Sequence, residues 1–439
     1  MFDVVIVGSG LSGLTCANEL QKNSKLRVLV VEARSVIGGR VSTNHTFSKH
    51  PIELGAELVH GTSVLNQYLS EINSTVTPVY TWAQGDGGPR PQQKVNGGRG
   101  YYYIGKESLL LPHDTTDPDF IHMNNVLHNM KTGTSLTESV YDYLVENRVS
   151  PRMISLANAG YANTLCSKLY LLPRYQTAQV MNDDANEEES ESVCHEGYDR
   201  LLTHLSKNNE IWTNWPVHCI SWKPNYVSIR SERGEVILAK RVVLATSVAV
   251  LKDMIFNPPL SQRRSRIYKM IKMEPCIKIA LRFRTRFYPE DFHGMICSDC
   301  PVPEFWSISR NSNKDSYIMI AFATSSYAAR LSNMSRLELR TTILSQLDRI
   351  FGSGKTPASD SYVDMVVQDW TRDRFIRGGY SSPSFHVSSK DREYIASPVQ
   401  QTLFFAGEYT SPKYMVMQSA IESGIRVAKE VISVRQSKL

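Results

Sequence analysis

The strongest constraint on the fold is a glycine-rich turn close to the N-terminus. The turn has the spacing GxGxxG and contains Gly8, Gly10 and Gly13. An apolar segment at 4–7 runs into the turn, and a helical pattern follows it at 11–21. A second apolar segment at 27–31 ends at Glu32. A strand, glycine turn, helix, strand and acid in this order predict a βαβ unit that binds a dinucleotide.

The residues of this unit suit different parts of a dinucleotide. Gly8 permits the tight turn, Gly10 lets the backbone approach a pyrophosphate, and Gly13 lets the helix pack closely on the strand. The N-terminus of the helix offers backbone N–H groups to the phosphates. Glu32 can accept hydrogen bonds from both hydroxyls of a ribose, and its negative charge disfavours a 2′-phosphate. The unit by itself fits both NAD and FAD.

The segments after Glu32 distinguish between these two cofactors. The sequence EAR at 32–34, followed by GGR at 38–40, resembles the corresponding stretch of flavin-containing amine oxidases. The sequence ELGAELVHG at 53–61 resembles the strand beneath the isoalloxazine in that family. The resemblance implies that FAD is the cofactor and that Arg40 lies near its flavin end. It implies FAD contacts from four more residues of these segments: Arg34, Gly39, Gly55 and Ala56.

Later segments resemble the same family. The residue that matches Val217 contacts the adenine through its backbone in the family, and 245–247 matches a segment close to the pyrophosphate. The apolar segment at 403–406, a Gly-Glu pair and the helix from 418 resemble the closing motif, which faces the ribityl phosphate and the flavin pyrimidine. The helix dipole there would stabilise negative charge. The resemblance thus adds five cofactor contacts: Val217, Trp370, Gly407, Glu408 and Val416.

Two positions match the rings that flank the amine in this family. Tyr380 provides one ring, whereas Val416 stands where the second ring is usual, and Tyr414 is a candidate substitute. The missing ring leaves the substrate preference and the strength of catalysis open. Family members that bind flavin covalently have a cysteine just before the position of Tyr380. Gly379 stands there in this chain, which implies that FAD is bound noncovalently.

Lys278 is the strongest catalytic candidate. It lies in an otherwise apolar stretch at 274–283, whose alternation places it on one face with Cys276 and Ala280. A charged side chain is costly to bury without a role, although a lysine at a strand end can also extend to solvent. In the resembling family a lysine at this position is bonded through water to flavin N5 and assists the reaction with O₂. His60 matches a substrate-facing position of polyamine oxidases; a structural histidine is the alternative.

The predicted fold class is α/β, with two interleaved domains. A Rossmann-type FAD-binding domain is expected from three segments: 1–75, 195–262 and 398–439. An α+β substrate-binding domain with a mixed sheet is expected from two segments: 76–194 and 263–397. We also expect strands within 210–260, helices near 137–147 and after Gly197, and an amphipathic helix at 337–351.

Composition argues against several other classes of protein. The net charge of +6 over 439 residues is modest and is spread along the chain, so we do not expect a nucleic-acid partner. The sequence has no run of the ~20 apolar residues that a membrane helix needs, and no basic leader typical of a signal peptide. The odd number of cysteines, seven, favours reduced thiols. Cys297 and Cys300 form an isolated CxxC, expected as free loop thiols, and no metal site is predicted.

The last three residues, Ser437-Lys438-Leu439, match the tripeptide that the peroxisomal import receptor reads at a C-terminus. We therefore expect a peroxisomal location, with the cytoplasm as the second choice. An acidic run within 183–191 has two interpretations. It is either a solvated loop or helix end, or a negative rim that attracts a polycation.

The resemblance implies an oxidoreductase, a flavoprotein of the amine oxidase type. The expected substrates are O₂ and an amine, of the polyamine or N-acetylpolyamine class, and the products are H₂O₂, an aldehyde and a shorter amine. One alternative is an L-amino-acid oxidase, which needs an arginine clamp for a carboxylate, with Arg90, Arg99 and Arg174 as candidates. Another is a flavin-binding protein with weakened catalysis, which the missing ring favours and Lys278 opposes.

Overall fold

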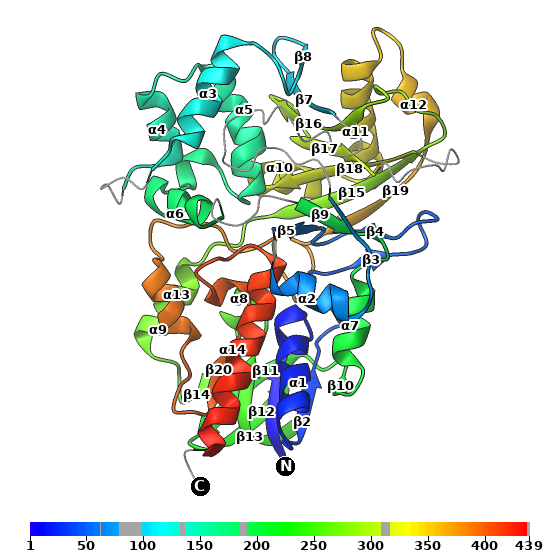
Figure 1. Ribbon diagram of the computed structural model, residues 1–439. Helices are drawn as coiled ribbons and strands as arrows, with labels where there is room; N and C mark the ends of the chain where they lie inside the picture. The colour runs from blue at the N-terminus through cyan, green and yellow to red at the C-terminus, as the bar shows by residue number, and fades with distance from the viewer. Residues whose placement is uncertain (62, 79–98, 132–136, 185–190, 309–316, 437–439) are drawn as a thin grey trace.

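The computed structural model describes residues 1–61, 63–78, 99–131, 137–184, 191–308 and 317–436. Two large sheets lie one above the other in Figure 1, and each is covered by helices from distant parts of the chain. Short strands, among them β5 (Leu58–His60) and β9 (Glu191–Cys194), lie between the two. The predicted combination of a Rossmann-type α/β unit and a second domain with a mixed sheet is confirmed.

The lower sheet has eight strands drawn from three separate regions of the chain. In spatial order they are β10 (Glu210–Trp212), β2 (Val28–Val31), β1 (Phe2–Val7), β13 (Val236–Leu244), β12 (Tyr226–Ser231), β11 (Val217–Lys223) and β14 (Ile255–Asn257), while β20 (Leu403–Phe405) also pairs with β13. β1 is parallel to both β2 and β13, and β12 is antiparallel to its neighbours. The βαβ unit predicted from the glycine turn is therefore present.

Alternating residues of β1 fill two different cores. Val4 and Ile6 face α1 (Leu11–Asn23) and α14 (Met417–Gln436), which pack side by side on one face of the sheet. Val5 and Val7 face the opposite core. Because side chains alternate across a strand, a strand covered on both faces reads as a continuous apolar run. This explains the sequence VVIV at 4–7.

Two helices that the sequence analysis did not detect cover the opposite face. They are α9 (Gln262–Met270) and α13 (Ser389–Ala396), and Ile267 and Ile395 join the core of the eight-stranded sheet. The helix α8 (Val248–Leu251) packs on the same core. Both undetected helices fall at or inside 263–397, the segment expected in the substrate-binding domain. They pack on the lower sheet because their few apolar residues complete its second face.

The upper sheet is mixed and has seven strands. In spatial order they are β19 (Tyr362–Asp369), β15 (Cys276–Phe283), β18 (Tyr317–Thr324), β17 (Glu304–Ser307), β16 (Phe292–Ser298), β7 (Arg99–Ile104) and β8 (Leu109–Pro112). The helices packed with it are α10 (Ser325–Ser332), α11 (Arg336–Phe351) and α12 (Pro357–Ser361). α11 confirms the helix predicted at 337–351, and its apolar side chains enter the core of this sheet.

A helical layer packs beside the upper sheet, in cyan and green in Figure 1. It contains α3 (Pro118–His128), α4 (Val140–Glu146), α5 (Pro151–Ala157), a π-helical turn (Asn158–Ala162), a 3₁₀ turn (Leu169–Leu171) and α6 (Arg174–Asp184). α4 is the helix expected near 137–147. Asp183 and Asp184 end α6 and Glu191 begins β9, whereas the rest of the acidic run lies outside the described residues.

The segment 53–61 is not the single strand that its pattern predicted. It divides between β4 (Ile52–Glu53) and β5, with an irregular turn at Gly55. A Cβ at Gly55 would lie 1.9 Å from the carbonyl oxygen of Arg40, so the two backbones touch. This contact replaces regular strand pairing. The remaining short elements are β3 (Thr43–Asn44), β6 (Val76–Pro78), α2 (Val64–Glu71), α7 (Asp199–Ser206) and a 3₁₀ turn (Glu408–Thr410).

Among the helices described, none is both long enough and apolar enough to cross a membrane.

Candidate active site

A cavity of about 850 Å³ extends from the first glycine turn to the upper sheet. Its volume is in the range of clefts that hold cofactors and small substrates. The structure brings fourteen of the residues predicted from the sequence to its surface: Gly8, Gly10, Glu32, Gly39, Arg40, Gly55, Ala56, His60, Val217, Lys278, Trp370, Tyr380, Glu408 and Val416. Residues as far apart in sequence as Gly8 and Val416 thus share one cavity.

Three residues predicted to contact the cofactor do not line the cavity. They support the segments that line it. Gly13 lies beneath the turn, where a Cβ would be 1.9 Å from the carbonyl oxygen of Gly8. Gly407 donates its N–H to Ser423 Oγ at 2.9 Å. Arg34 donates to the carbonyl oxygen of Gly39 at 2.7 Å and contacts Asp373 at 3.3 Å. Close packing and these bonds hold the turn, the closing motif and the 38–40 segment in place.

The dinucleotide end of the cavity is open where a pyrophosphate would need space. A Cβ at Gly10 would meet Gly39 Cα at 3.9 Å as its nearest described neighbour. No described side chain caps the N-terminus of α1, so its N–H groups face this space. Glu32 is buried and held by hydrogen bonds from Ser9 N at 2.9 Å and Ser9 Oγ at 2.6 Å. This cradle fits a dinucleotide such as FAD.

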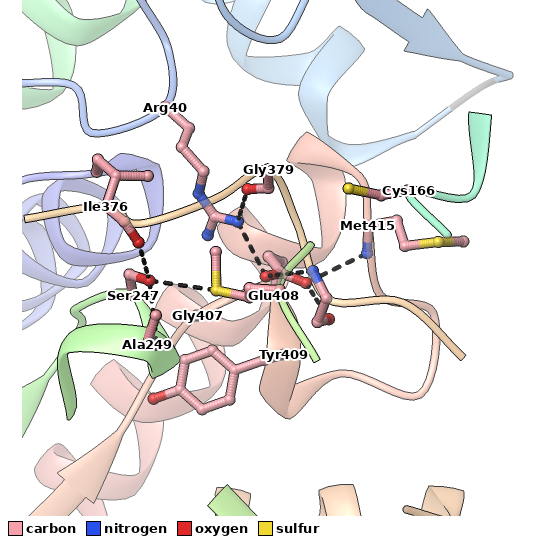
Figure 2. A network of polar contacts seen from close by, with 12 residues as sticks. Arg40, Cys166, Ser247, Ala249, Ile376, Gly379, Gly407, Glu408, Tyr409 and Met415 are labelled. Atoms are coloured by element: carbon pink, nitrogen blue, oxygen red, sulfur yellow. Dashed lines mark hydrogen bonds and ion pairs between the residues drawn. The ribbon is translucent and has the colours of Figure 1, made fainter. Parts of the chain in front are cut away.

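Arg40 and Glu408 form a network at the middle of the cavity (Figure 2). Arg40 Nη1 donates to the carbonyl oxygen of Gly379 at 2.9 Å and to Glu408 Oε1 at 3.1 Å. Glu408 Oε2 accepts from Ser381 Oγ at 2.6 Å. Burial raises the pKa of Glu408, but Arg40, Ser381 and Arg392 together outweigh burial and lower it. The ionised carboxylate therefore fixes Arg40 and the loop before Tyr380.

Lys278 is buried on β15 and has a carboxylate partner. Its ammonium lies 2.5 Å from Glu57 Oε2 and donates to the carbonyl oxygen of Gly55 at 3.2 Å. The side chain is 4% exposed and its nitrogen is 5.1 Å from the centre of the Trp306 ring. The lysine was predicted to stand alone in an apolar stretch, and its carboxylate partner was not foreseen. Glu57 also lines the cavity, so the pair presents an ion pair to whatever the cavity holds.

Aromatic side chains line the cavity close to Lys278. Tyr380 donates its hydroxyl to the carbonyl oxygen of Thr164 at 2.5 Å, and burial raises its pKa well above the usual value, so it stays neutral. Trp370 donates its indole N–H to the carbonyl oxygen of Leu54 at 3.0 Å. Trp306 and Phe322 add a pair of rings with centres 5.8 Å apart, which the sequence analysis missed.

Tyr414 does not replace the missing second ring. Its side chain is buried behind the cavity, with the ring centre 3.5 Å from the guanidinium carbon of Arg392. Met415 and Val416 line the cavity at this point. The prediction that Tyr414 supplies the second ring is therefore wrong, because its cation–π contact with Arg392 holds the tyrosine away from the cavity. Rings from the upper sheet, Trp306 and Phe322, supply aromatic surface elsewhere on the wall.

Glu304 is a second buried carboxylate of the cavity wall. It lies on β17, is 8% exposed, and accepts a hydrogen bond from Asn163 Nδ2 at 3.0 Å. Asn163 in turn accepts from the backbone N–H of Thr324 at 2.8 Å. No motif marked Glu304, since it follows no recognisable pattern. A charged residue among the apolar residues of the 302–306 segment is the one signal that could have drawn attention to it.

Within the described part of the chain, no group of three or more His, Cys, Asp or Glu side chains is arranged to hold a metal ion. The candidate site consists of a dinucleotide cradle that leads to a slot lined by aromatic residues, the Lys278–Glu57 ion pair and the buried carboxylate of Glu304.

Comparisons with known proteins agree with this geometry. The family model "Flavin containing amine oxidoreductase" matches residues 11–432. Polyamine oxidase 1 of Zea mays is 24% identical, over 99% of this chain and 91% of its own length. Lysine-specific histone demethylase 1 homolog 3 of Arabidopsis thaliana is 24% identical over 99% of this chain, which spans 30% of that protein's length.

Solved structures show the same fold. Cyclohexylamine oxidase from Brevibacterium oxydans superposes with a TM-score of 0.83 at 19% identity and covers 99% of both chains. Wild-type putrescine oxidase bound to putrescine superposes with a TM-score of 0.80 at 19% identity, over 98% of this chain and 99% of its own.

Proposed function

The chain belongs to the flavin-containing amine oxidoreductase family, and on this premise we propose that it oxidises a polyamine or an N-acetylpolyamine. Oxidation takes place at a carbon beside a secondary amine nitrogen and gives an imine, which water hydrolyses to an aldehyde and a shorter amine, while O₂ is reduced to H₂O₂. When bound, noncovalent FAD supplies the hydride acceptor, with O₂ as the final oxidant. Gly379 supports noncovalent binding, since a Cβ there would already lie 2.9 Å from Cys166 Sγ.

The observation that carries this proposal is the buried carboxylate of Glu304 on the cavity wall. A carboxylate that faces an aromatic slot favours a cationic substrate, because a charge-assisted hydrogen bond from an ammonium group to a carboxylate is stronger than one between neutral groups. Glu57 is paired with Lys278, and Glu304, which accepts a hydrogen bond from Asn163 Nδ2, lines the cavity where the ammonium of a substrate would lie. Tyr380 and Trp306 exclude water around the amine that reacts.

The rival function, L-amino-acid oxidation, needs an arginine free to bind a carboxylate. Arg99 and Arg174 pair with Asp114 and Glu138 and do not line the cavity, while Arg90 lies outside the described residues. Arg40 lines the cavity, but its guanidinium already donates hydrogen bonds to Glu408 and to the carbonyl oxygen of Gly379. These contacts favour an amine over an amino acid.

The test of the proposal is peroxide release by the purified flavoprotein with spermine, spermidine, N-acetylspermine, a monoamine and several L-amino acids. We expect turnover of the polyamines and none of the amino acids. Turnover of the amino acids alone would establish the rival. Bound FAD with no turnover of any compound would favour the weakened-catalysis alternative.

Replacing Glu304 with glutamine is expected to raise KM for spermine by about 10- to 100-fold, because a hydrogen bond to a charged group contributes about 1.5–3 kcal/mol. KM for a monoamine is expected to change little. Steady-state kinetics on both substrates measure the difference. The matched control is Glu290→Gln, since Glu290 also lines the cavity but its side chain is 96% exposed. The proposed role of Glu304 would be contradicted if Glu304→Gln and Glu290→Gln raised KM for spermine equally. It would also be contradicted if Glu304→Gln raised KM for spermine and for the monoamine equally.

We further propose a peroxisomal location, with the cytoplasm as the alternative. The support is the tripeptide Ser437-Lys438-Leu439, which lies outside the described residues, and the H₂O₂ that the proposed reaction makes.

A further inference from the structure

Two cysteines far from the glycine turn form a close pair at the end of a strand. Cys297 belongs to β16 and Cys300 follows in a turn in which Asp299 has a φ of +54°. This left-handed residue turns the chain back toward β16, so that the two thiols lie close enough to influence each other's pKa. Both residues are free and buried, and Cys297 lies in a strand rather than in the expected loop, whereas Asp299 and Pro301 on either side of Cys300 are exposed.

Arg349 places a positive charge against one of the two sulfurs. It comes from α11, and its Nη2 lies 3.1 Å from Cys300 Sγ. The guanidinium carbon lies 5.6 Å from the centre of the Tyr103 ring, which helps to fix its position. The hydrogen bond from Cys297 and the charge of Arg349 outweigh burial and lower the pKa of Cys300. Burial raises the pKa of Cys297 well above its usual value.

The pKa of Cys300 is thus lowered and the pKa of Cys297 is raised, so that one cysteine can react as a thiolate while the other remains a thiol. A thiolate is the form that attacks an oxidant, and a neighbouring thiol then resolves the product. Burial instead raises the pKa of four other cysteines, which makes them less reactive: Cys16, Cys166, Cys194 and Cys276.

We propose that Cys297 and Cys300 are a modification site, a dithiol that peroxide oxidises to a disulfide. The Cys300 thiolate attacks one oxygen of H₂O₂, the O–O bond breaks, and the hydroxide that leaves takes up a proton to become water. The Cys297 sulfur loses its proton and attacks the Cys300 sulfenic acid; the S–S bond forms, the S–O bond breaks and a second water leaves. The two thiols lose two electrons, and one peroxide gains them.

This inference does not depend on the amine chemistry, because peroxide can be added. The holoenzyme without amine is treated with a small excess of H₂O₂, free thiols are alkylated, and peptides are analysed by mass spectrometry. We expect the peptide with Cys297 and Cys300 to lose two hydrogen atoms and to resist alkylation until it is reduced with dithiothreitol. A peptide that keeps both thiols free, or one in which Cys300 is oxidised without a link to Cys297, would overturn the proposal.

Substitution of Arg349 tests the origin of the reactivity. Arg349→Gln is expected to slow disulfide formation about tenfold, because the Cys300 thiolate loses its positive partner. Arg340→Gln is the matched control, since Arg340 lies on the same helix and its guanidinium faces the Tyr362 ring instead. Equal rates for Arg349→Gln and Arg340→Gln would overturn the role of Arg349. Circular dichroism of both variants verifies that α11 remains folded.

Discussion

Replacing Gly10 with valine is expected to weaken FAD binding strongly and to leave the fold intact. A Cβ at Gly10 would have Gly39 Cα, at 3.9 Å, as its nearest described neighbour, so the protein itself has room for a side chain. The backbone there, with φ −70° and ψ 175°, is a conformation that valine adopts readily. The space that the side chain would fill is the space that a pyrophosphate needs. Since overpacking typically costs about 1–3 kcal/mol, we expect FAD binding to weaken by about 10- to 100-fold.

The measurements are the flavin content of the purified protein and the melting temperature of the flavin-free form. Gly13→Ala is the informative comparison, because a Cβ there would lie 1.9 Å from the carbonyl oxygen of Gly8 and 3.2 Å from Ala245 Cβ. That variant is expected to lose stability as well as flavin, since α1 must move away from β1. A Gly10→Val protein with normal flavin content would mean that the cofactor follows another path through the cavity.

The dinucleotide-binding unit could be predicted from the sequence because its signals are local. The glycine spacing, the apolar segment at 4–7 and Glu32 all lie within one short stretch, so local periodicity and turn chemistry suffice to recognise them. The helix α9 could not be recognised in this way, because most of its residues are polar. Its buried residue Arg264 donates to the carbonyl oxygens of Ile395 at 2.6 Å and of Ser397 at 2.9 Å. Only the packing of distant segments gives this arginine its partners.

The candidate site shows the same division between local and distant information. Lys278 is marked by its own strand, as a charge among apolar residues. Its partner Glu57 lies 221 positions away. The motif at 53–61 predicted a role for Gly55 but none for the Glu57 carboxylate. Tyr414 was a candidate for the missing ring by its position in sequence alone, yet Arg392 holds its ring away from the cavity. Proximity in sequence could not reveal which way that side chain turns.

Replacing Lys278 with methionine is expected to lower kcat/KM for O₂ by about 100-fold or more. Loss of a positioned proton-transfer group typically costs a factor of 10²–10⁴. The family resemblance assigns this lysine to the reaction with O₂, so we expect the loss in the oxygen-dependent step. Anaerobic mixing with amine, followed by mixing with O₂, separates the two half-reactions. A loss confined to the anaerobic step would contradict this role and would place Lys278 in amine binding.

Stability measurements separate this chemical role from a structural one. Removing one partner of a buried ion pair leaves the other charge unpaired, which costs about 3–5 kcal/mol in a fully buried site. Lys278→Met and Glu57→Gln are each expected to lower the free energy of unfolding, and somewhat less in Lys278→Met, because the Glu57 side chain is 15% exposed. The double variant is expected to regain most of that stability, since neither charge remains, and to stay inactive. Activity that returned together with stability would show that Lys278 serves only to neutralise Glu57, because a proton-transfer role cannot be restored by a methionine.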